Sequence, residues 1–259
     1  MCGRYAVTAD PATLAEELDA LDETGGAART GYNIAPTTEI AAVVDRHDRS
    51  DGDDNAGAAV RRRIRAMRWG LVPVWAKDLK SGPLLFNARS ETVATKPAFR
   101  TSYSRHRCLV PMDGWYEWRP ATTGSRPAKT PYFMSHRDGE RLYAAGIWSA
   151  WKDPQGAKDE GSLLSCSILT TAAVGNLAAI HDRMPLMLHA GQWDQWLDPD
   201  GGPPDALLAS PGEAFAAAIS IREVRPLVNS VRNDGPELLQ PVAQADDSAT
   251  DEGDGPALF

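Results

Sequence analysis

The run CLVPMDGWYEW, residues 108–118, says most about the fold, because it is apolar and rich in residues that favour β-strands. Three shorter runs of the same kind follow, separated by polar linkers, at residues 132–135, 142–148 and 163–170. Helical stretches and a last strand are predicted around these runs, at residues 97–105, 174–180, 192–197, 213–218 and 223–228. The interleaving is irregular and lacks a strict βαβ alternation, so we predict a mixed, mainly antiparallel α+β domain.

A short amphipathic helix is predicted to follow an N-terminal strand. Asp10 and Pro11 form an N-cap followed by proline at the first helical position. Leu14, Leu18 and Leu21 then recur at helical spacing. The glycine pair that follows predicts the end of this helix.

Residues 45–60, DRHDRSDGDDNAGAAV, are polar and without periodicity, so we expect an exposed acidic loop. The loop joins a strand predicted at 39–44 to a strand that begins in the basic run RRRIR, residues 61–65. A basic run most often forms a solvated face of a strand, and nucleic-acid binding is the alternative.

The length of 259 residues suits one large domain or two small ones, and we predict one domain at residues 1–240. Residues 241–259 are rich in Asp, Ala and Gly and lack a core-forming pattern, so we expect a disordered acidic tail. No apolar run approaches the roughly 20 residues that span a bilayer, and no secretory signal pattern begins the chain. We therefore expect a soluble, cytoplasmic protein without a membrane partner.

The net charge of −8 weighs at first against a nucleic-acid partner. Five of the acidic residues lie in 243–259, which holds no Lys or Arg, so the rest of the chain carries −3 instead of −8. A local basic groove is compatible with that charge.

The three cysteines are odd in number and lack the spacing of metal ligands, so neither a disulfide framework, nor a metal site, nor a cofactor is predicted. Cys108 and Cys166 lie in strand-like apolar runs, where a buried, inert cysteine is expected. Cys2 has no such core sequence around it.

Cys2 follows the initiator methionine. Removal of that methionine would leave Cys2 with both a free α-amine and a thiol. Both groups ordinarily titrate near neutral pH, at roughly 8 and about 8.5. Such a 1,2-aminothiol suits an aldehyde, because the amine forms a Schiff base and the thiolate then closes a five-membered thiazolidine ring. The alternative is that position 2 is an incidental, frayed terminus.

Three further residues are candidates for chemistry at a site. Asn87, in NARSE, could hold a carbonyl or hydroxyl group, or it could simply make a turn. Glu117 stands between two aromatic residues, which favours a raised pKa and acid–base work, although a solvent-facing strand position is the alternative. His181, in HDRMP, could transfer protons near neutral pH or serve as a structural histidine.

Arginines provide the candidate phosphate contacts. Arg4, Arg89 and Arg183 would bind phosphate groups if they converge in the fold. Taken singly, each suits a surface salt bridge.

Taken together, these motifs resemble one family. In order along the chain they read MCGRY, YNIAPT, RWGLVP, FNARSET, KPAF, CLVPMDGWYEW, TTAA, HDRMP and LVNSV. This series closely resembles the SRAP family, the SOS response-associated peptidase or abasic-site processing proteins. The resemblance covers about residues 2–232, and it departs from the family in the loop at 45–60 and in the tail.

The resemblance implies a function, a partner and a fold. It implies that Cys2, after loss of Met1, crosslinks to the aldehyde of an abasic site in single-stranded DNA through a thiazolidine. It also implies a monomer with a barrel-like core and peripheral helices, acting at the nucleoid during DNA damage. The matching catalytic positions are Cys2, Asn87, Glu117 and His181. The matching DNA-binding positions are Arg4, Pro36, Trp69, Arg89, Thr170 and Arg183.

The roles expected from this match divide the chemistry among the residues. We expect His181 to assist opening of the sugar, Glu117 to move protons at the amine, and Asn87 to position the sugar hydroxyls. Trp69 is the first candidate for stacking against a base. A strand-cleaving lyase step is an expected side reaction, and the alternatives are a cysteine-type autopeptidase or a noncatalytic single-strand binder.

Overall fold

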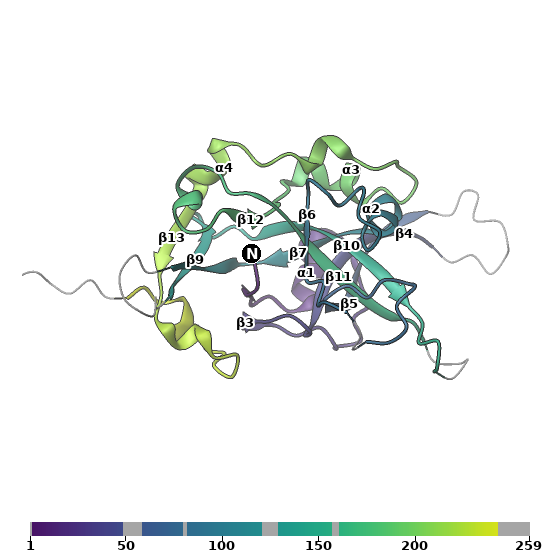
Figure 1. Ribbon diagram of the computed structural model, residues 1–259, viewed down its shortest axis with the longest axis horizontal. Coiled ribbons are helices and arrows are strands. Elements are labelled where there is room, and N and C mark those ends of the chain that lie inside the picture. Colours follow the sequence, from purple (N-terminus) through teal and green to yellow (C-terminus); the bar gives the residue numbers. More distant parts are fainter. Residues whose placement is uncertain (1, 49–58, 80–81, 121–128, 157–160, 243–259) are drawn as a thin grey trace, which may run out of the picture.

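The computed structural model describes residues 2–48, 59–79, 82–120, 129–156 and 161–242. The described residues form two sheets that share one core, with short helices at the periphery (Figure 1). Most strand pairs are antiparallel, so the predicted mixed, mainly antiparallel α+β class is confirmed. The tail at 243–259 lies outside the described residues, and its predicted disorder stays a prediction.

The larger sheet closes on itself. Its strands follow the order β12-β11-β10-β7-β4-β5-β2, and an additional parallel pairing of β11 with β5 joins β11, β10, β7, β4 and β5 into a ring. This ring is the barrel-like core. Its strands are β4 (Glu39–His47), β5 (Val60–Trp69), β7 (Arg107–Met112), β10 (Leu142–Trp151) and β11 (Leu163–Ala172), and β2 (Leu21–Asp22), β6 (Asn87–Arg89) and β12 (Arg183–Pro185) attach to it.

The smaller sheet has five strands in the order β13-β9-β8-β1-β3, all antiparallel. Its bounds are β1 (Tyr5–Val7), β3 (Gly31–Ile34), β8 (Gly114–Pro120), β9 (Lys129–His136) and β13 (Ile219–Glu223). The apolar run 108–118 therefore serves both sheets: its first half is β7, and its second half is β8. A corner between them at Asp113 carries the chain from one sheet to the other.

Successive strand residues contribute to different cores, as the alternation of side chains in a strand requires. In β4, Ala42 and Val44 join the cluster inside the ring, whereas Ala41 and Val43 join the cluster on its outer face. Both faces are buried, which explains why these strands read as unbroken apolar runs in the sequence.

Some of the short helices cover the outer face of the ring, where they supply buried residues such as Leu14 and Trp196. Others pack elsewhere, as Ala216 of one helix does in the cluster inside the ring. The α-helices are α1 (Pro11–Leu18), α2 (Arg100–Arg105), α3 (Trp193–Leu197) and α4 (Glu213–Ala218). The 3-10 helices are η1 (Gly175–Ala179), η2 (Ala190–Gln192), η3 (Asp205–Leu208), η4 (Pro226–Asn229) and η5 (Pro236–Leu239). Within the described ranges, no helix is long and apolar enough to cross a membrane.

Several predicted boundaries were wrong. Asp45 to His47 of the predicted loop belong to β4, and Val60 belongs to β5, because the two strands pair as far as His47 opposite Val60. Residues 49–58 of that loop lie outside the described residues. The helix predicted at 174–180 is a 3-10 helix, and Leu21, counted as helical, lies in β2 and is 43% exposed.

Gly114 permits the corner between the two sheets. A Cβ atom at this position would lie 2.3 Å from the Met134 carbonyl oxygen and 2.5 Å from the Phe133 ring. Neither the Met134 backbone nor the buried Phe133 ring can move away from such an atom without a cost in free energy.

We therefore predict that Gly114→Ala lowers the free energy of unfolding by about 2 kcal/mol. Gly202→Ala is the matched control, because nothing lies within 4 Å of a Cβ atom there. Urea unfolding of the two variants measures the difference. Equal stability would show that the corner relaxes without cost.

Candidate active site

Cys2 lies inside the core. Its residue exposure is 0%, and it belongs to the cluster that fills the ring. The prediction that Cys2 lacks a core was therefore wrong. The next residues hold it there: Tyr5 in β1 pairs with Trp115 in β8, and the Tyr116 N–H donates to the Arg4 carbonyl at 2.9 Å. Continuing this antiparallel register brings the Cys2 segment beside the Glu117 end of β8.

Asn87 contacts Cys2 directly. It begins β6, which pairs in parallel with β11 so that Asn87 lies level with Ile168. Its side-chain Nδ2 donates to the Cys2 carbonyl oxygen at 2.8 Å. Its Oδ1 is buried and accepts no hydrogen bond from the described residues. That oxygen is an acceptor in position for a hydroxyl or N–H group of a ligand.

Glu117 is a buried carboxyl group beside Cys2. Its residue is 3% exposed, and burial raises its pKa to about 7 from an ordinary 4.5. Burial also raises the pKa of the Cys2 thiol well above its usual range, and the nearby Glu117 charge raises it further. The expectation of an appreciable thiolate fraction at neutral pH was therefore wrong for the folded protein. A neutral thiol next to a carboxyl group that titrates near neutrality can react when its proton is taken up by a base.

His181 precedes β12 and is partly buried. Its Nδ1 accepts the backbone N–H of Arg183 at 2.9 Å and lies 2.8 Å from Asp182 Oδ1. An Nδ1 that carries a proton could donate to Asp182 but could not accept from Arg183, and burial lowers the pKa of His181 and so disfavours the ring protonated on both nitrogens. The neutral ring that accepts from Arg183 is therefore favoured, with its proton on Nε2.

The HDRMP and YEW motifs act on each other electrostatically. Asp182 raises the pKa of both Glu117 and His181, and Lys129, the first residue of β9, lowers the pKa of both. Two proton-transfer candidates far apart in sequence therefore share one charged neighbourhood. Lys129 had no distinguishing signal in the sequence.

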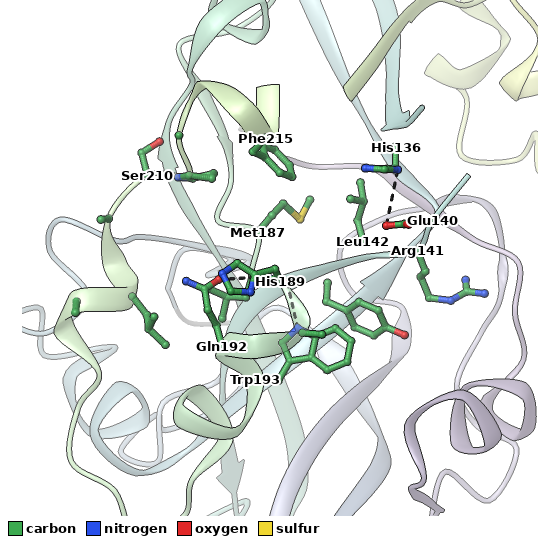
Figure 2. Close-up of a pocket in the computed structure, with 18 residues that line it drawn as sticks. His136, Glu140, Arg141, Leu142, Met187, His189, Gln192, Trp193, Ser210 and Phe215 are labelled. Carbon is green, nitrogen blue, oxygen red and sulfur yellow. Dashed lines mark hydrogen bonds and ion pairs between the residues drawn. The ribbon is translucent and has the colours of Figure 1, made fainter. Parts of the chain in front are cut away.

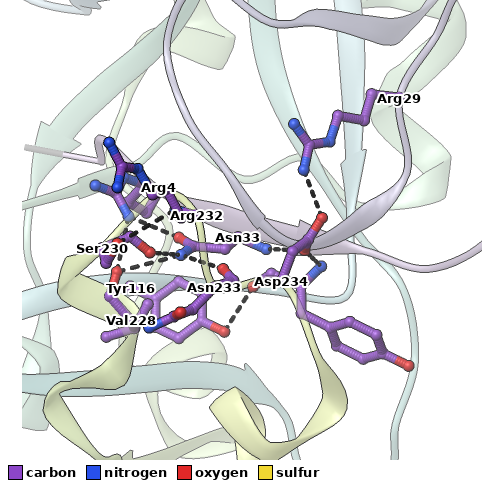
Figure 3. Close-up of polar contacts among 10 residues, drawn as sticks. Arg4, Arg29, Asn33, Tyr116, Val228, Ser230, Arg232, Asn233 and Asp234 are labelled. Atoms are coloured by element: carbon purple, nitrogen blue, oxygen red, sulfur yellow. Dashed lines mark hydrogen bonds and ion pairs between the residues drawn. The ribbon is translucent and has the colours of Figure 1, made fainter.

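The Arg4 side chain forms its hydrogen bonds within the protein. Its Nη1 donates to Asn33 Oδ1 at 2.7 Å and to the Val228 carbonyl at 2.8 Å (Figure 3). Asn33 in turn donates to the Val228, Ser230 and Asn233 carbonyls at 2.9–3.2 Å. Asp234 accepts the Tyr32 and Asn33 backbone N–H groups and pairs with Arg29. We call this network of Arg4, Asn33 and Asp234 the clasp, since it fastens the LVNSV segment to β1 and β3.

The other two arginines differ in their availability. Arg183 pairs with Glu91 through both terminal guanidinium nitrogens, Nη1 and Nη2, and Nη2 also donates to the Thr170 carbonyl. The Arg89 side chain is exposed and makes no hydrogen bond or ion pair with any described residue. Arg89 is therefore the best placed of the three predicted arginines to bind a phosphate group.

Of the residues predicted to contact bases, two are buried. Trp69 is 0% exposed, packs edge-on against Tyr5 and Phe86, and donates its indole N–H to the Phe86 carbonyl. Its ring faces cannot receive a base in this structure, so its assignment as a stacking platform was wrong. Thr170 is also 0% exposed, and Pro36 is partly exposed in the loop before β4.

Trp75 is a large, exposed aromatic side chain that none of the sequence motifs singled out as a DNA contact. It is 65% exposed on the segment that joins β5 to Asn87. The only sequence signal was the high number of tryptophans, 8 in 259 residues, which does not tell an exposed one from a buried one.

A cavity of about 620 Å³ lies apart from these residues, between the α3 and α4 regions (Figure 2). Met187, Trp193 and Phe215 line it, with His136 and His189 among its polar residues. None of the predicted catalytic or DNA-binding residues lines it. Among the residues that the structure describes, no group of three His, Cys, Asp or Glu side chains could hold a metal ion.

The raised pKa of Glu117 makes stability depend on pH in a defined direction. The native protein binds this proton more tightly than the unfolded chain, so the contribution is fully present below about pH 4.5 and is lost as pH rises through about 7. Glu117→Gln carries no such proton. Relative to the parent protein, it should gain about 3 kcal/mol in the free energy of unfolding between pH 4.5 and pH 8.

Urea unfolding across this pH range measures that gain. Glu140→Gln is the control, because the Glu140 side chain is 74% exposed and burial is the cause under test. A difference between Glu117→Gln and the parent that stays flat with pH would contradict the raised pKa.

Known proteins resemble this chain over most of its length. The abasic site processing protein YoqW of Bacillus subtilis is 32% identical over 93% of this chain and 99% of its own length. YedK of Escherichia coli, with the same description, is 31% identical over 93% of this chain and 100% of its own. HMCES of Gallus gallus, also so described, is 31% identical over 93% of this chain and 78% of its own.

A crystal structure of a Bacteroides thetaiotaomicron protein shares the fold, with a TM-score of 0.73 and 22% identity over 93% of this chain and 100% of that one. The sequence model of the family described as SOS response associated peptidase (SRAP) matches residues 1–231. A match over most of the chain, together with these relatives, shows that the protein belongs to the SRAP family.

Proposed function

We propose that this protein captures abasic sites in single-stranded DNA by forming a covalent thiazolidine with Cys2 after removal of Met1. The observation that carries the proposal is the environment of Cys2: Asn87 donates to its carbonyl at 2.8 Å, and the buried Glu117, with a pKa of about 7, lies beside its thiol. The names of the relatives, abasic site processing proteins, support the same substrate.

The reaction begins at the sugar. His181 passes the proton of the C1′ hydroxyl to the ring oxygen of the closed sugar as the bond between C1′ and that oxygen breaks, and the sugar opens to expose the C1′ aldehyde. The neutral α-amine of Cys2 then attacks C1′, forming a C–N bond, and the proton released from nitrogen moves to the carbinolamine oxygen. Glu117, which titrates near neutrality, can accept and return that proton, and loss of water leaves the imine.

The thiol reacts second. The Cys2 sulfur adds to the imine carbon, forming the C–S bond, while its proton passes through Glu117 to the imine nitrogen. This step closes the ring with no external reductant or oxidant. Because the pKa of the thiol is raised, the free protein holds it protonated until the imine is present. Asn87 Oδ1, buried and still able to accept, suits a hydroxyl of the opened sugar.

The imine has a second outcome. Loss of the proton on C2′ of the sugar would expel the 3′ phosphate by β-elimination and break the strand. Rapid ring closure by the thiol competes with this elimination. Lyase activity is therefore a side reaction that should grow when the thiol is missing.

Arg89 and Trp75 are the DNA contacts we favour. The Arg89 side chain is exposed and makes no hydrogen bond or ion pair with the described residues, and Trp75 offers an exposed ring to a base farther along the strand, because its neighbour Ala76 is hydrogen-bonded to Trp151 at the Leu163 end of β11. A single strand can splay its bases onto such a ring, at about 1–3 kcal/mol for each stack. Arg4 and Arg183 serve instead to position Cys2 and the HDRMP segment, since both are engaged with the protein.

The first test mixes the protein with a single strand that contains one abasic site. The parent protein should give a band that survives denaturing electrophoresis, and Cys2→Ala should give none. Cys2→Ser should give a band only after borohydride reduction, because its amine can form the imine while its hydroxyl does not close the stable ring. The intact mass of the parent protein should show loss of Met1.

Other outcomes identify the competing functions. Equal bands from the parent and Cys2→Ala proteins would refute the role of Cys2. Cleavage of a supplied peptide without any crosslink would favour a peptidase, and salt-sensitive binding alone would favour a noncatalytic single-strand binder.

A second test concerns stacking. Trp75→Ala should weaken binding to an undamaged single strand by roughly 5- to 100-fold, the equivalent of one lost stack. Trp75→Phe keeps an aromatic face and should retain most of the affinity. Fluorescence anisotropy at fixed salt measures both variants. Unchanged affinity in Trp75→Ala would exclude this residue as a platform.

A further inference from the structure

A second polar cavity lies toward the opposite end of the ring from Asn87. Its volume is about 420 Å³, and it is lined by apolar and polar side chains. The apolar ones are Val44, Met67, Trp148 and Leu164, and the polar ones are Glu23, Arg46, His47, Arg63 and Arg65. Leu164 stands four residues before Ile168 on β11, and Ile168 lies level with Asn87. The two levels are therefore about 13 Å apart along the strand.

The arginines of the basic run in β5 that line this cavity are already paired with carboxylates. Arg63 pairs with Glu23 and Asp48, and Arg65 pairs with Glu23. Arg61, at the edge of the run, pairs with Asp48. The structure therefore favours the solvated, ion-paired interpretation of this run over a nucleic-acid surface.

Arg46 is different. Its guanidinium carbon lies 4.5 Å from the centre of the Trp148 ring, and no carboxylate of the described residues pairs with it. Burial lowers the pKa of Arg46, and the charges of Arg107 and Arg65 lower it further. The positive charge of Arg107 is not neutralised by a carboxylate of the described residues, because its side chain donates to backbone carbonyls such as those of Trp196 and Asp198.

The Trp148 ring forms part of the cavity wall. The Trp148 indole N–H is buried and has no acceptor among the described residues. His106 stacks on Trp148, with ring centroids 4.5 Å apart and planes inclined by 29°. The Arg46 and His106 contacts hold the tryptophan ring in place, so its N–H and the Arg46 guanidinium keep a fixed relation.

From this geometry we infer that the cavity is an anion site for a phosphate group, with Arg46 as its principal ligand. A guanidinium fork matches the oxygens of a phosphate, and an anion would offset the crowding of Arg46, Arg65 and Arg107. The phosphate could be a free ion or the terminal phosphate of a nucleic-acid strand. The site is separate from the Cys2 chemistry and does not depend on it.

The experiment has two arms. In the first, inorganic phosphate is added to the full chain at constant ionic strength, with chloride as the balancing ion, and the Tm is followed. In the second, an undamaged single strand with a 5′-phosphate is compared with the same strand ending in a 5′-hydroxyl, by fluorescence anisotropy. Phosphate should raise the Tm of the parent protein, and Arg46→Gln should weaken the apparent phosphate affinity by about tenfold or more.

The two arms distinguish the sources of phosphate. Tighter binding of the phosphorylated strand, lost in Arg46→Gln, would assign the site to a strand end. A Tm rise that depends on Arg46, without any preference between the strands, would assign it to a free phosphate. No Arg46-dependent effect in either arm would overturn the proposal.

Control variants separate binding from folding. Arg61→Gln removes an arginine that pairs with Asp48 and does not line the cavity, so it should keep the phosphate response. Arg46→Lys keeps the charge without the fork and should bind phosphate weakly, which tests the site if Arg46→Gln folds poorly. Cys2→Ala should bind phosphate as the parent does, so failure of the crosslinking proposal would not be mistaken for failure here.

Discussion

Burial of the Glu117 carboxyl group beside Cys2 is the constraint on which the candidate site depends. A carboxylate taken out of water is costly, and the protein responds by raising the pKa of Glu117 to about 7. The same burial keeps the Cys2 thiol protonated. Surface positions would leave the acid ionised and the thiol partly ionised. The ring interior instead keeps the thiol protonated beside a carboxyl group that titrates near neutrality, and such a pair suits the proton exchange that we propose.

The charges around this site divide into structural and available groups. Arg4 fastens the clasp and Arg183 pairs with Glu91, so both arginines position other residues and have few donors left for DNA. Arg89 and Trp75 are exposed and stand on segments that lead into and out of Asn87. An acidic chain can bind a polyanion in this way, because a few exposed cationic and aromatic groups matter more than the net charge.

The sequence predicted the fold class and the residues of the site better than their environments. Apolar runs predicted the strands, and the motifs singled out Cys2, Asn87, Glu117 and His181. The hydrophobic periodicity and the composition of the sequence do not distinguish the buried Trp69 from the exposed Trp75. The difference depends on the closure of the ring, in which β11 pairs with β5, a strand far from it in the sequence. For the same reason, the pairing of Arg183 with Glu91 and the burial of Cys2 depend on tertiary contacts that no local pattern records.

The order of the two bond-forming steps in the reaction that we propose follows from these environments. A thiolate at Cys2 would attack an aldehyde at once and give a reversible hemithioacetal, whereas a buried thiol with a raised pKa does not. The amine is thus the first nucleophile, and the imine it forms is the electrophile that the thiol meets within the same residue. Holding the Cys2 carbonyl by Asn87 limits the motion of both groups, so ring closure gains from proximity. In this proposal the enclosed position of Cys2, which first looks like an obstacle to reaction, directs the chemistry toward a closed ring.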